Sequence, residues 1–372
     1  MQQDIDGVRT WVEVDRGALK HNFDIISGLL HTDTLLMAVA KSNAYGHDMV
    51  QYARELEKLG VDWIGVDSIV EAITVREYGI STPLLVLGYT LPCRIEDAVL
   101  HGIAVTVSSL DSLKEIVAVK NNLSIHLKID TGMSRQGILP EEVDEALFVL
   151  SENPQIVLGG VYTHLATAKN PSMRDGTNVQ LRRFNEVKDA VLACGLQPIF
   201  HVAATGGTFL YPDAHFDMVR VGIGMYGMWP STQTRAVCEK KYPLNPILTW
   251  KTRLSQVKIL KKGEGIGYDL TERAQEDMLV GTFPVGYWHG YPRAYSSVAP
   301  VLIRRKQARV MGRVSMDMST VDLSTVPDAK AGDEVVLLGQ GIDADYLGGV
   351  SETSCYEVTT RINPLIKRVY VG

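Results

Sequence analysis

Apolar and polar residues alternate in blocks over the first two thirds of the chain. Short apolar runs, typical of strands buried on both faces, are separated by longer stretches with the apolar spacing of amphipathic helices. The runs predict eight strands, at residues 35–41, 63–67, 84–88, 104–108, 125–130, 157–164, 199–205 and 218–226. The helical stretches between them include residues 49–58, 68–78, 140–150 and 178–194.

Eight alternating strand and helix units predict an α/β fold with a parallel sheet, and their number matches a (β/α)8 barrel. An open, doubly wound sheet is the alternative. The first of these strands is not followed by a GxGxxG sequence, so the main signature of dinucleotide binding in that fold is missing. Ahead of the barrel, residues 11–14 alternate like a short strand, and Asp15 is placed to cap a helix that runs to residue 30.

The pattern changes after about Tyr242. Helical spacing fades, and β-rich segments separated by glycine- and proline-containing turns follow at residues 248–260, 278–285, 300–303, 309–314 and 334–338. We therefore predict a barrel over residues 1–242 and a mostly β domain over residues 243–372, with residues 1–14 able to pair with the β domain.

Composition narrows the class of protein. A chain of 372 residues favours two domains, and 45% hydrophobic with 22% charged residues is typical of a soluble globular protein. The net charge of −6 is spread along the chain, which gives no reason to expect nucleic acid or a membrane as a partner. Residues 1–4 lack the basic start of a signal peptide, and four separated cysteines form neither a disulfide framework nor a metal site. We expect a cytoplasmic protein without a bound metal.

Several predicted strands end on polar residues, which in a barrel meet at the edge where chemistry takes place. Lys41 is the most notable, because it directly follows a buried run and should be partly withdrawn from water. Such an amine can form a Schiff base or shuttle a proton. The plain alternative is a solvated lysine at a strand end. The other polar strand ends are Asp67, Ser108, Asp130, His164 and Thr205.

Two cations lie inside apolar strands and therefore need an explanation. Lys128 requires a partner or a chemical modification, and a buried ion pair with a barrel acid is the plain alternative. Arg220 must meet an acceptor, either a carboxylate or a ring nitrogen. Residues 203–207 leave backbone amides beside the hydroxyl of Thr205, which suits a phosphate. His164 and His201 are each as often structural as catalytic.

The motifs together resemble those of the alanine racemase family. The stretch Ala40-Lys41-Ser42-Asn43-Ala44-Tyr45-Gly46-His47 is similar to the family's pyridoxal-phosphate lysine signature. The resemblance continues in order over nearly the whole chain, at residues 128–135, 163–164, 220–222, 267–268, 286–287, 290–293, 312–313, 316–317, 356–357 and 361.

This resemblance implies a racemase that interconverts L-alanine and D-alanine through an external aldimine of pyridoxal 5'-phosphate, supplying D-alanine for peptidoglycan. Lys41 would hold the cofactor as an internal aldimine and act as one base. Tyr268 of the partner subunit would act as the other base, in a head-to-tail homodimer with shared active sites.

The resemblance also implies supporting roles. Arg220 would pair with the pyridine nitrogen, and His164 would link Arg220 to Tyr268. The cofactor phosphate would be held by Tyr45, Thr205, the Gly222 and Ile223 amides and Tyr356. Arg135 and the Met316 amide would receive the substrate carboxylate, with Lys128 carbamylated beside Arg135. The access channel would be lined by Asp317, Tyr287, Arg293 and Arg313.

The chain departs from the family pattern at two places. Ala204-Thr205 stands where Asn-Ser is common, and Trp288-His289 stands where Ala-Asp or Gly-Asp is usual. The second change puts the charge of the access channel and the substrate range in question. A racemase of the same fold acting on serine or lysine is therefore an alternative, as is a pyridoxal-phosphate-binding protein without catalysis. A related decarboxylase fits less well, because Arg135 would clamp the carboxylate that has to leave.

Overall fold

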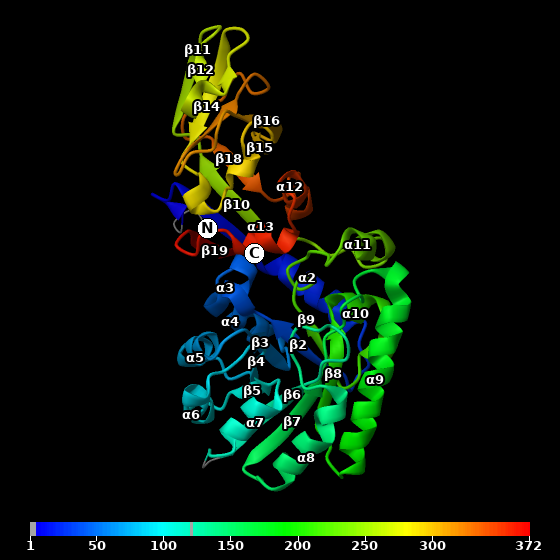
Figure 1. Cartoon of the computed structure of the whole chain (residues 1–372). Helices are drawn as coiled ribbons and strands as arrows, with labels where there is room; N and C mark the ends of the chain where they lie inside the picture. The colour runs from blue at the N-terminus through cyan, green and yellow to red at the C-terminus, as the bar shows by residue number, and fades with distance from the viewer. Residues whose placement is uncertain (1–4, 120–121) are drawn as a thin grey trace. The chain divides into compact units, whose positions relative to one another are not determined.

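The computed structural model describes residues 5–119 and 122–372 (Figure 1). Residues 1–4, on which the signal-peptide expectation rests, lie outside this range. The chain forms two compact units. The barrel unit contains Leu19–Ala44 and Met49–Asn245, and the sheet unit contains the described residues up to Ala18 together with Tyr45–Asp48 and Pro246–Gly372. The chain thus passes between the units four times, after residues 18, 44, 48 and 245.

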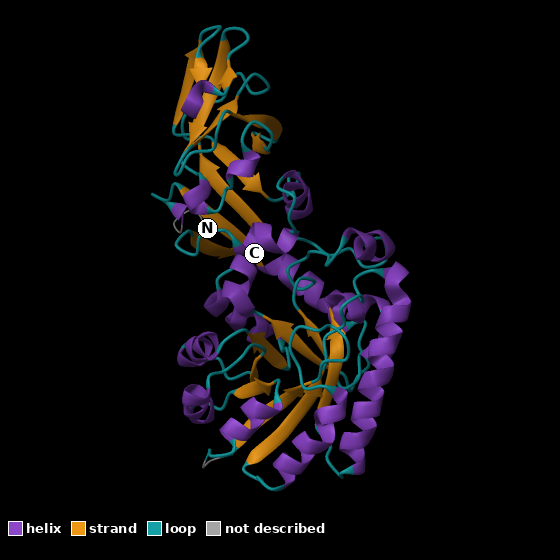
Figure 2. Cartoon of the chain, in the orientation of Figure 1, coloured by secondary structure: helices purple, strands orange, loops and turns teal. Residues whose placement is uncertain are grey.

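The barrel unit is a closed barrel of eight parallel strands with helices around it, which confirms the fold class predicted from the sequence (Figure 2). The strands are β2 (Leu35–Val39), β3 (Trp63–Val66), β4 (Leu84–Val86), β5 (Ala104–Val107), β6 (Leu123–Lys128), β7 (Ile156–Tyr162), β8 (Ile199–Ala204) and β9 (Met218–Val221). Inside the barrel Met37, Leu85, Ala104 and Met218 pack as one apolar cluster.

The barrel helices follow the predicted periodicity. They are α2 (Arg16–Ser27), which begins in the sheet unit, α4 (Met49–Leu59), α5 (Ile69–Glu77), α6 (Ile95–Leu100), α7 (Leu110–Ile116), α8 (Val143–Ser151), α9 (Arg174–Ala193), α10 (Thr205–Leu210) and α11 (Thr232–Cys238). Asp15 caps α2, since its Oδ1 accepts the Ala18 N–H at 2.9 Å.

One strand is shorter than the sequence suggested. The apolar run 218–226 predicted a single strand, but β9 ends at Val221 and the chain then turns tightly. The Met225 N–H donates to the Gly222 carbonyl at 2.9 Å, and the Tyr226 N–H to the Ile223 carbonyl at 3.2 Å. The prediction of one strand over this run is wrong because buried turns are as apolar as buried strands.

The sheet unit is built on a nine-stranded sheet in the order β11-β14-β17-β16-β15-β18-β10-β1-β19. The bounds are β1 (Thr10–Asp15), β10 (Leu248–Arg253), β11 (Gln256–Leu260), β14 (Met278–Phe283), β15 (Pro300–Ile303), β16 (Lys306–Met311), β17 (Ser319–Asp322), β18 (Glu334–Leu338) and β19 (Lys367–Val371). A separate hairpin joins β12 (Gly265–Ile266) and β13 (Glu272–Arg273). Two short helices, α12 (Ala344–Val350) and α13 (Cys355–Thr360), complete the unit.

The first strand closes this sheet with segments from the far end of the chain. β1 pairs antiparallel with β10 and parallel with β19. Trp11 and Trp250 are buried in the unit's core. Among the described residues, no helix has the length and apolar character needed to cross a bilayer.

Candidate active site

Lys41 stands directly after β2 at the carboxyl edge of the barrel. Its Nζ lies 3.2 Å from Oδ1 of Asp67, which follows β3, and its side chain is 40% exposed. The side chain is therefore partly withdrawn from water, as expected, and the residue before it, Ala40, is fully buried.

The backbone after Lys41 has an unusual conformation. α3 (Lys41–Gly46) is left-handed, with φ of 55°, 54°, 51° and 52° at Ser42, Asn43, Ala44 and Tyr45. For residues with a Cβ this costs about 1–2 kcal/mol each. Such strain persists only where the surroundings hold it in place, and it is concentrated at functional sites.

Glu71 on α5 holds the start of this turn. Its Oε1 accepts the Ser42 N–H at 2.8 Å, and its Oε2 accepts the Asp67 N–H at 2.7 Å. The carboxylate of Glu71 thus accepts backbone N–H groups that follow two neighbouring strands. These hydrogen bonds fix the position of the backbone from which the side chains of Lys41 and Asp67 project.

Arg220, on β9, lies fully inside the barrel at 3% exposure. Its Nη1 donates to the His201 carbonyl at 2.8 Å and lies 3.1 Å from His201 Nδ1. Its Nη2 donates to the Thr163 carbonyl at 2.7 Å and the Val202 carbonyl at 3.1 Å. The buried charge is therefore satisfied by dipoles, and the carboxylate considered from the sequence does not occur among its described partners.

The remaining donor of Arg220 is its Nε–H, which meets no acceptor among the described residues. Burial lowers the pKa of Arg220 to about 10, so the group stays charged near neutral pH. The guanidinium also lies over the Tyr162 ring, 4.9 Å from its centroid. An acceptor that reaches Nε would meet a donor that is charged and fixed in direction.

His164 follows β7, with its Nδ1 3.4 Å from Nη2 of Arg220. Because a guanidinium only donates, Nδ1 must be the acceptor and the ring proton lies on Nε2. Burial, reinforced by the charge of Arg220, lowers the pKa of His164 to about 3. The ring is thus a neutral donor through Nε2 at physiological pH.

Lys128 ends β6 and is 6% exposed. Burial and the nearby charges of Arg135, Arg220 and Lys41 lower its pKa to about 8. No carboxylate forms an ion pair with it among the described residues, so the structure does not support the plain alternative of a barrel ion pair. A substantial fraction of this amine is neutral and nucleophilic at mildly alkaline pH.

Arg135 stands on an exposed turn that Asp130 organises. Oδ1 of Asp130 accepts the N–H groups of Gly132, Met133 and Ser134 at 2.9, 2.9 and 3.0 Å. Partial burial alone would raise the pKa of Asp130, but these hydrogen bonds lower it. Asp130 is therefore occupied by the backbone, while the guanidinium of Arg135 has no ion-pair partner among the described residues.

The residues expected to bind phosphate in the barrel lie at the ends of β8 and β9. Oγ1 of Thr205 accepts the Gly224 N–H at 3.3 Å. The N–H groups of Gly222 and Ile223 donate to no acceptor in the described part of the chain. A hydroxyl and two open amides on adjacent strand ends are suited to an anion.

In the sheet unit, Tyr268 lies in the turn η5 (Tyr268–Leu270), between β12 and β13, and is 69% exposed. The turn is again left-handed, with φ of 59° at Asp269 and 47° at Leu270. Arg313 forms an ion pair with Asp269, the residue next to Tyr268 in the chain. Part of its hydrogen-bonding capacity is therefore already used.

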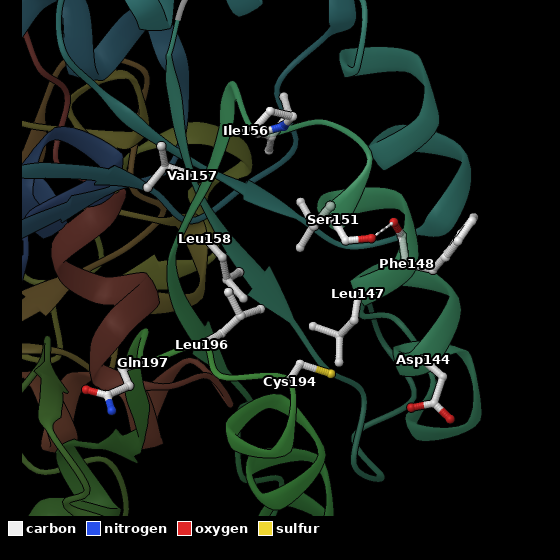
Figure 3. Close-up of a pocket in the computed structure, with 12 residues that line it drawn as sticks. Asp144, Leu147, Phe148, Ser151, Ile156, Val157, Leu158, Cys194, Leu196 and Gln197 are labelled. Atoms are coloured by element: carbon white, nitrogen blue, oxygen red, sulfur yellow. Dashed lines mark hydrogen bonds between the residues drawn. The ribbon is translucent and has the colours of Figure 1, made fainter.

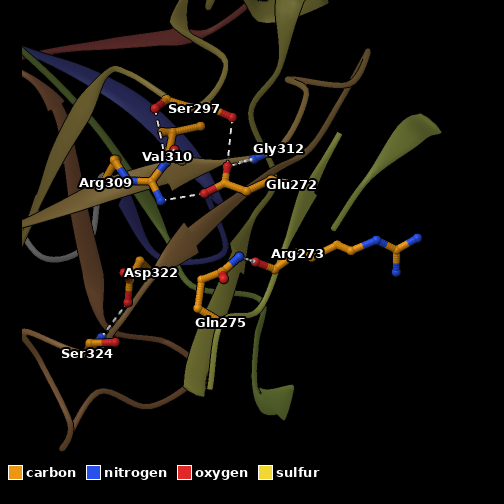
Figure 4. Close-up of polar contacts among 9 residues, drawn as sticks. All are labelled: Glu272, Arg273, Gln275, Ser297, Arg309, Val310, Gly312, Asp322 and Ser324. Atoms are coloured by element: carbon orange, nitrogen blue, oxygen red, sulfur yellow. Dashed lines mark hydrogen bonds and ion pairs between the residues drawn. The ribbon is translucent and has the colours of Figure 1, made fainter. Parts of the chain in front are cut away.

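Glu272 anchors this hairpin to the rest of its unit, as Figure 4 shows. Its Oε2 accepts the Ser297 hydroxyl at 2.7 Å and the Gly312 N–H at 2.8 Å, and its other oxygen pairs with Arg309. Desolvation opposes ionisation of Glu272, but the hydrogen bonds lower its pKa. The carboxylate thus fixes the strand that follows Tyr268.

Met316 and Asp317 lie in a loop that is joined to the turn carrying Trp288 and His289. The Tyr287 N–H donates to the Ser315 carbonyl and the Trp288 N–H to the Met316 carbonyl, both at 3.0 Å. The Met316 N–H donates to nothing among the described residues. Tyr287 is 44% exposed and Arg293 is also exposed.

The structure clarifies the second family departure. His289 is 6% exposed, and its Nδ1 accepts the Gly286 N–H at 3.3 Å, so this ring closes a turn rather than lining a surface. Asp317 lies 4.0 Å away. Trp288, at 59% exposure, is the residue of the pair that changes the surface.

Tyr45 and Tyr356, both in the sheet unit, form an aromatic pair with centroids 6.0 Å apart. Burial strongly raises the pKa of Tyr356, so its hydroxyl stays protonated and can donate to an anion.

Two cavities complete the description. One of about 700 Å³ is lined by Leu147, Leu158, Leu196 and neighbouring residues, at the amino ends of barrel strands (Figure 3). Barrel chemistry lies at the opposite, carboxyl ends, so this cavity is not the candidate active site. The other, of about 750 Å³, lies in the sheet unit between Tyr287, Trp288, Arg293 and Arg361.

Sequence reasoning missed the residues that hold the site in place through partners distant in sequence. Glu71 and Glu272 look like ordinary surface acids in the sequence, and Tyr162 looks like a core aromatic residue. No pattern along the chain could have identified them, since each is defined by a partner distant in sequence.

Two protein-family models match the chain. Residues 14–230 match the family model described as alanine racemase, N-terminal domain, and residues 247–370 match the model of the C-terminal domain. An alanine racemase of Symbiobacterium thermophilum is 38% identical, with 99% of each chain covered, and one of Leptospira interrogans is 34% identical, covering 98% and 97%.

Solved structures are similarly close. The alanine racemase of Clostridium difficile 630 has a TM-score of 0.93 at 33% identity, with 98% of this chain and 96% of that chain covered. The alanine racemase from Bacillus anthracis with bound L-Ala-P has a TM-score of 0.92 at 32% identity, covering 98% and 95%.

Proposed function

The chain belongs to the alanine racemase family, and we propose that it interconverts L-alanine and D-alanine with pyridoxal 5'-phosphate, using Lys41 and Tyr268 as its two bases. The observation that carries this proposal is Arg220. Its two terminal nitrogens are occupied by protein acceptors, and its Nε–H remains for a ring nitrogen.

The residues present fit this cofactor. Arg220 offers a charged donor suited to the pyridine nitrogen. For the phosphate, the barrel unit would supply Thr205 and the amides of Gly222 and Ile223, and the sheet unit would supply Tyr45 and Tyr356. Ala204-Thr205 retains a hydroxyl, which already accepts the Gly224 N–H, so the first family departure keeps a hydrogen-bonding group.

When bound, pyridoxal phosphate supplies an electron sink that eases removal of the substrate's Cα proton. Racemisation must take this proton from one face and return one to the other. Lys41 would hold the cofactor and exchange the proton on one face. Tyr268 of the partner subunit would exchange it on the other face, in a homodimer with shared sites.

His164 connects these groups. Because its Nδ1 accepts from Arg220, its Nε2–H is available to donate to the phenol oxygen of Tyr268, which would favour loss of the phenol proton. The low pKa of His164 keeps the ring neutral in this role.

Arg135 and the Met316 N–H would receive the substrate carboxylate, because both are donors without an acceptor in the described chain. Lys128 would be carbamylated: its neutral amine adds to carbon dioxide, forming an N–C bond and releasing one proton. The buried cation would thereby become an anion that can pair with Arg135.

Asp317, Tyr287, Arg293 and Arg313 would line the access channel. The structure favours Trp288 over His289 as the residue that modifies this channel, because His289 is buried. We further propose a cytoplasmic enzyme that supplies D-alanine for peptidoglycan, in keeping with cysteines that carry thiols rather than disulfides among the described residues.

The function is tested by reducing the purified protein with borohydride and mapping the labelled peptide. We expect the cofactor to be trapped on Lys41, and a protein that binds no pyridoxal phosphate would refute the proposal. Racemisation should then be measured in both directions on alanine, serine and lysine, since Trp288 leaves the substrate range to be determined. A serine or lysine preference would replace alanine as the substrate.

The two-base assignment has its own test. Tyr268→Phe should impair proton removal mainly from L-alanine while the cofactor remains bound to Lys41. Equal loss of isotope exchange from both enantiomers would contradict the assignment. An active monomer after dilution would contradict the contribution of Tyr268 from a partner subunit.

A further inference from the structure

Behind Arg220 lie two histidines that the proposed chemistry does not use. His126 on β6 and His201 on β8 are both fully buried. Nδ1 of His126 lies 2.9 Å from Nε2 of His201, and Nδ1 of His201 lies 3.1 Å from Nη1 of Arg220. The three side chains form one hydrogen-bonded series across the interior of the barrel.

The arginine dictates the position of every proton in this series. A guanidinium only donates, so Nδ1 of His201 must carry the lone pair and its proton must lie on Nε2. That N–H then donates to Nδ1 of His126, whose own proton must lie on Nε2. Burial lowers the pKa of His126 to about 3 and that of His201 well below its usual value, so both rings are neutral.

The last N–H of the series, at Nε2 of His126, is left without an acceptor in the described part of the chain. Nε2 of His126 is buried and has no hydrogen-bond partner among the described residues. The ring meets Trp63 edge-on, with centroids 5.3 Å apart. Leaving a buried N–H unpaired is unfavourable, so a histidine at this position needs a compensating reason.

The surrounding strand is shaped to accept this ring. A Cβ at Gly160 on β7 would lie 2.3 Å from Nδ1 of His126, and one at Gly159 would lie 3.4 Å from its Nε2. His201 is fixed as well, because its ring stacks on Tyr162 at 4.7 Å, and the Tyr162 hydroxyl lies 2.9 Å from Oγ1 of Thr106. The rings therefore have little freedom to turn.

We propose that His126 is a positioning residue for the cofactor's ring nitrogen. It accepts the proton of His201, which holds His201 in the tautomer that accepts from Nη1 of Arg220 and so keeps Nε–H directed at the ring nitrogen. Without an acceptor at position 126, the Nε2–H of His201 would be left buried and unpaired, which disfavours the tautomer that accepts from Arg220. This role rests on the proposed function, because the acceptor for Nε is the bound cofactor.

The test compares the binding of two probes, pyridoxal phosphate and its 1-deaza analogue, in which carbon replaces the ring nitrogen. The variant His126→Phe removes the acceptor, and His126→Asn restores one through its Oδ1. The unaltered protein should bind pyridoxal phosphate more tightly than the analogue. His126→Phe should lose about tenfold of this preference, the effect of one hydrogen bond, while binding the analogue as before.

His126→Asn should keep most of the preference. Equal weakening of both probes in His126→Phe would show that the ring acts only by packing and would overturn the role. Failure of the unaltered protein to bind pyridoxal phosphate would overturn the proposed function and this role together.

Because His126→Phe could fail to fold, proton positions in the unaltered holoenzyme provide a second measurement. Nitrogen-15 chemical shifts of labelled histidine, or neutron diffraction, should place the protons of His126 and His201 on Nε2. A proton on Nδ1 of His201 would overturn the proposal.

Discussion

Two buried arginines, one in each unit, use the same chemistry for different ends. Arg220 in the barrel unit is 3% exposed and Arg368 in the sheet unit is 9% exposed. Burial lowers the pKa of each to about 10. Both are stabilised mainly by backbone carbonyl oxygens, since neither forms an ion pair with a carboxylate among the described residues.

The difference lies in the third nitrogen. In Arg368 all three nitrogens donate to backbone carbonyl oxygens. Nε donates to Gly46 at 2.9 Å. Nη1 donates to Asn363 and Ile366 at 2.6 Å each, and Nη2 donates to Ile362 at 3.0 Å. Arg220 uses only its two terminal nitrogens in this way. The fold thus occupies all three nitrogens of Arg368, whereas the Nε–H of Arg220 meets no acceptor among the described residues and is available to a ligand.

The largest expected effect is the loss of activity when Arg220 is replaced. Arg220→Met removes the donor that we propose for the ring nitrogen and leaves several carbonyls unpaired, so we expect kcat/KM to fall by about 10³-fold in both directions. Arg368→Lys, which keeps a buried cation at the matching position, should change kcat/KM of the folded protein by less than about threefold. Steady-state racemisation measures both, and a similar loss in both variants would contradict the distinction.

The next effect is acid sensitivity of the barrel unit. The unfolded chain takes up histidine protons as the pH falls through about 6.5, whereas His126 and His164 stay neutral in the fold down to a pKa of about 3. The contribution of each of these histidines to the free energy of unfolding is therefore fully present above about pH 6.5. It falls by about 2 kcal/mol per histidine between pH 7 and pH 5.

Hydrogen exchange read by mass spectrometry tests this expectation for each unit separately. Barrel strands should lose protection at pH 5 before the sheet unit does. Protection of the barrel that is unchanged between pH 7 and pH 5, after correction for intrinsic exchange rates, would contradict neutral burial of these rings.

Arg368→Met gives an effect of intermediate size, and mainly on stability. The carbonyls of Gly46, Ile362, Asn363 and Ile366 would lose their donor, at a cost of about 3 kcal/mol in the free energy of unfolding. Urea denaturation followed by hydrogen exchange should locate the loss in the sheet unit. A stable variant with lost activity would assign Arg368 to chemistry and remove the contrast with Arg220.

The smallest effect concerns the Tyr268 hairpin. Glu272→Gln keeps the shape of the side chain but weakens the hold on Gly312, Ser297 and Arg309, so proton removal from L-alanine should slow by about tenfold with a loss of about 1 kcal/mol in stability. Asp277→Asn is the matched control, because Asp277 pairs with Lys261 at 55% exposure in the same region. Equal effects of the two changes would show that Glu272 has no particular role.

The sequence predicted the fold well because each barrel strand is a local apolar run. It also identified Arg220, since a cation inside an apolar strand is conspicuous. It could not predict the left-handed turn after Lys41, because Ser42-Asn43-Ala44-Tyr45 contains no glycine to signal positive φ. Glu71 holds that turn by accepting the Ser42 N–H, although the two residues are far apart in sequence. The burial of His289 likewise depends on the turn that it closes at Gly286. These features arise only from tertiary structure.

The four passages of the chain between its units have a consequence for dividing the molecule. A cut after residue 245 would leave β1 in the first half, separated from both of its pairing strands in the second. It would also separate Gly46 from Arg368. The two halves therefore cannot be exchanged between relatives at this boundary. A gene fusion or split version of this protein must keep residues 5–18 and 45–48 together with a carboxyl-terminal half from the same protein.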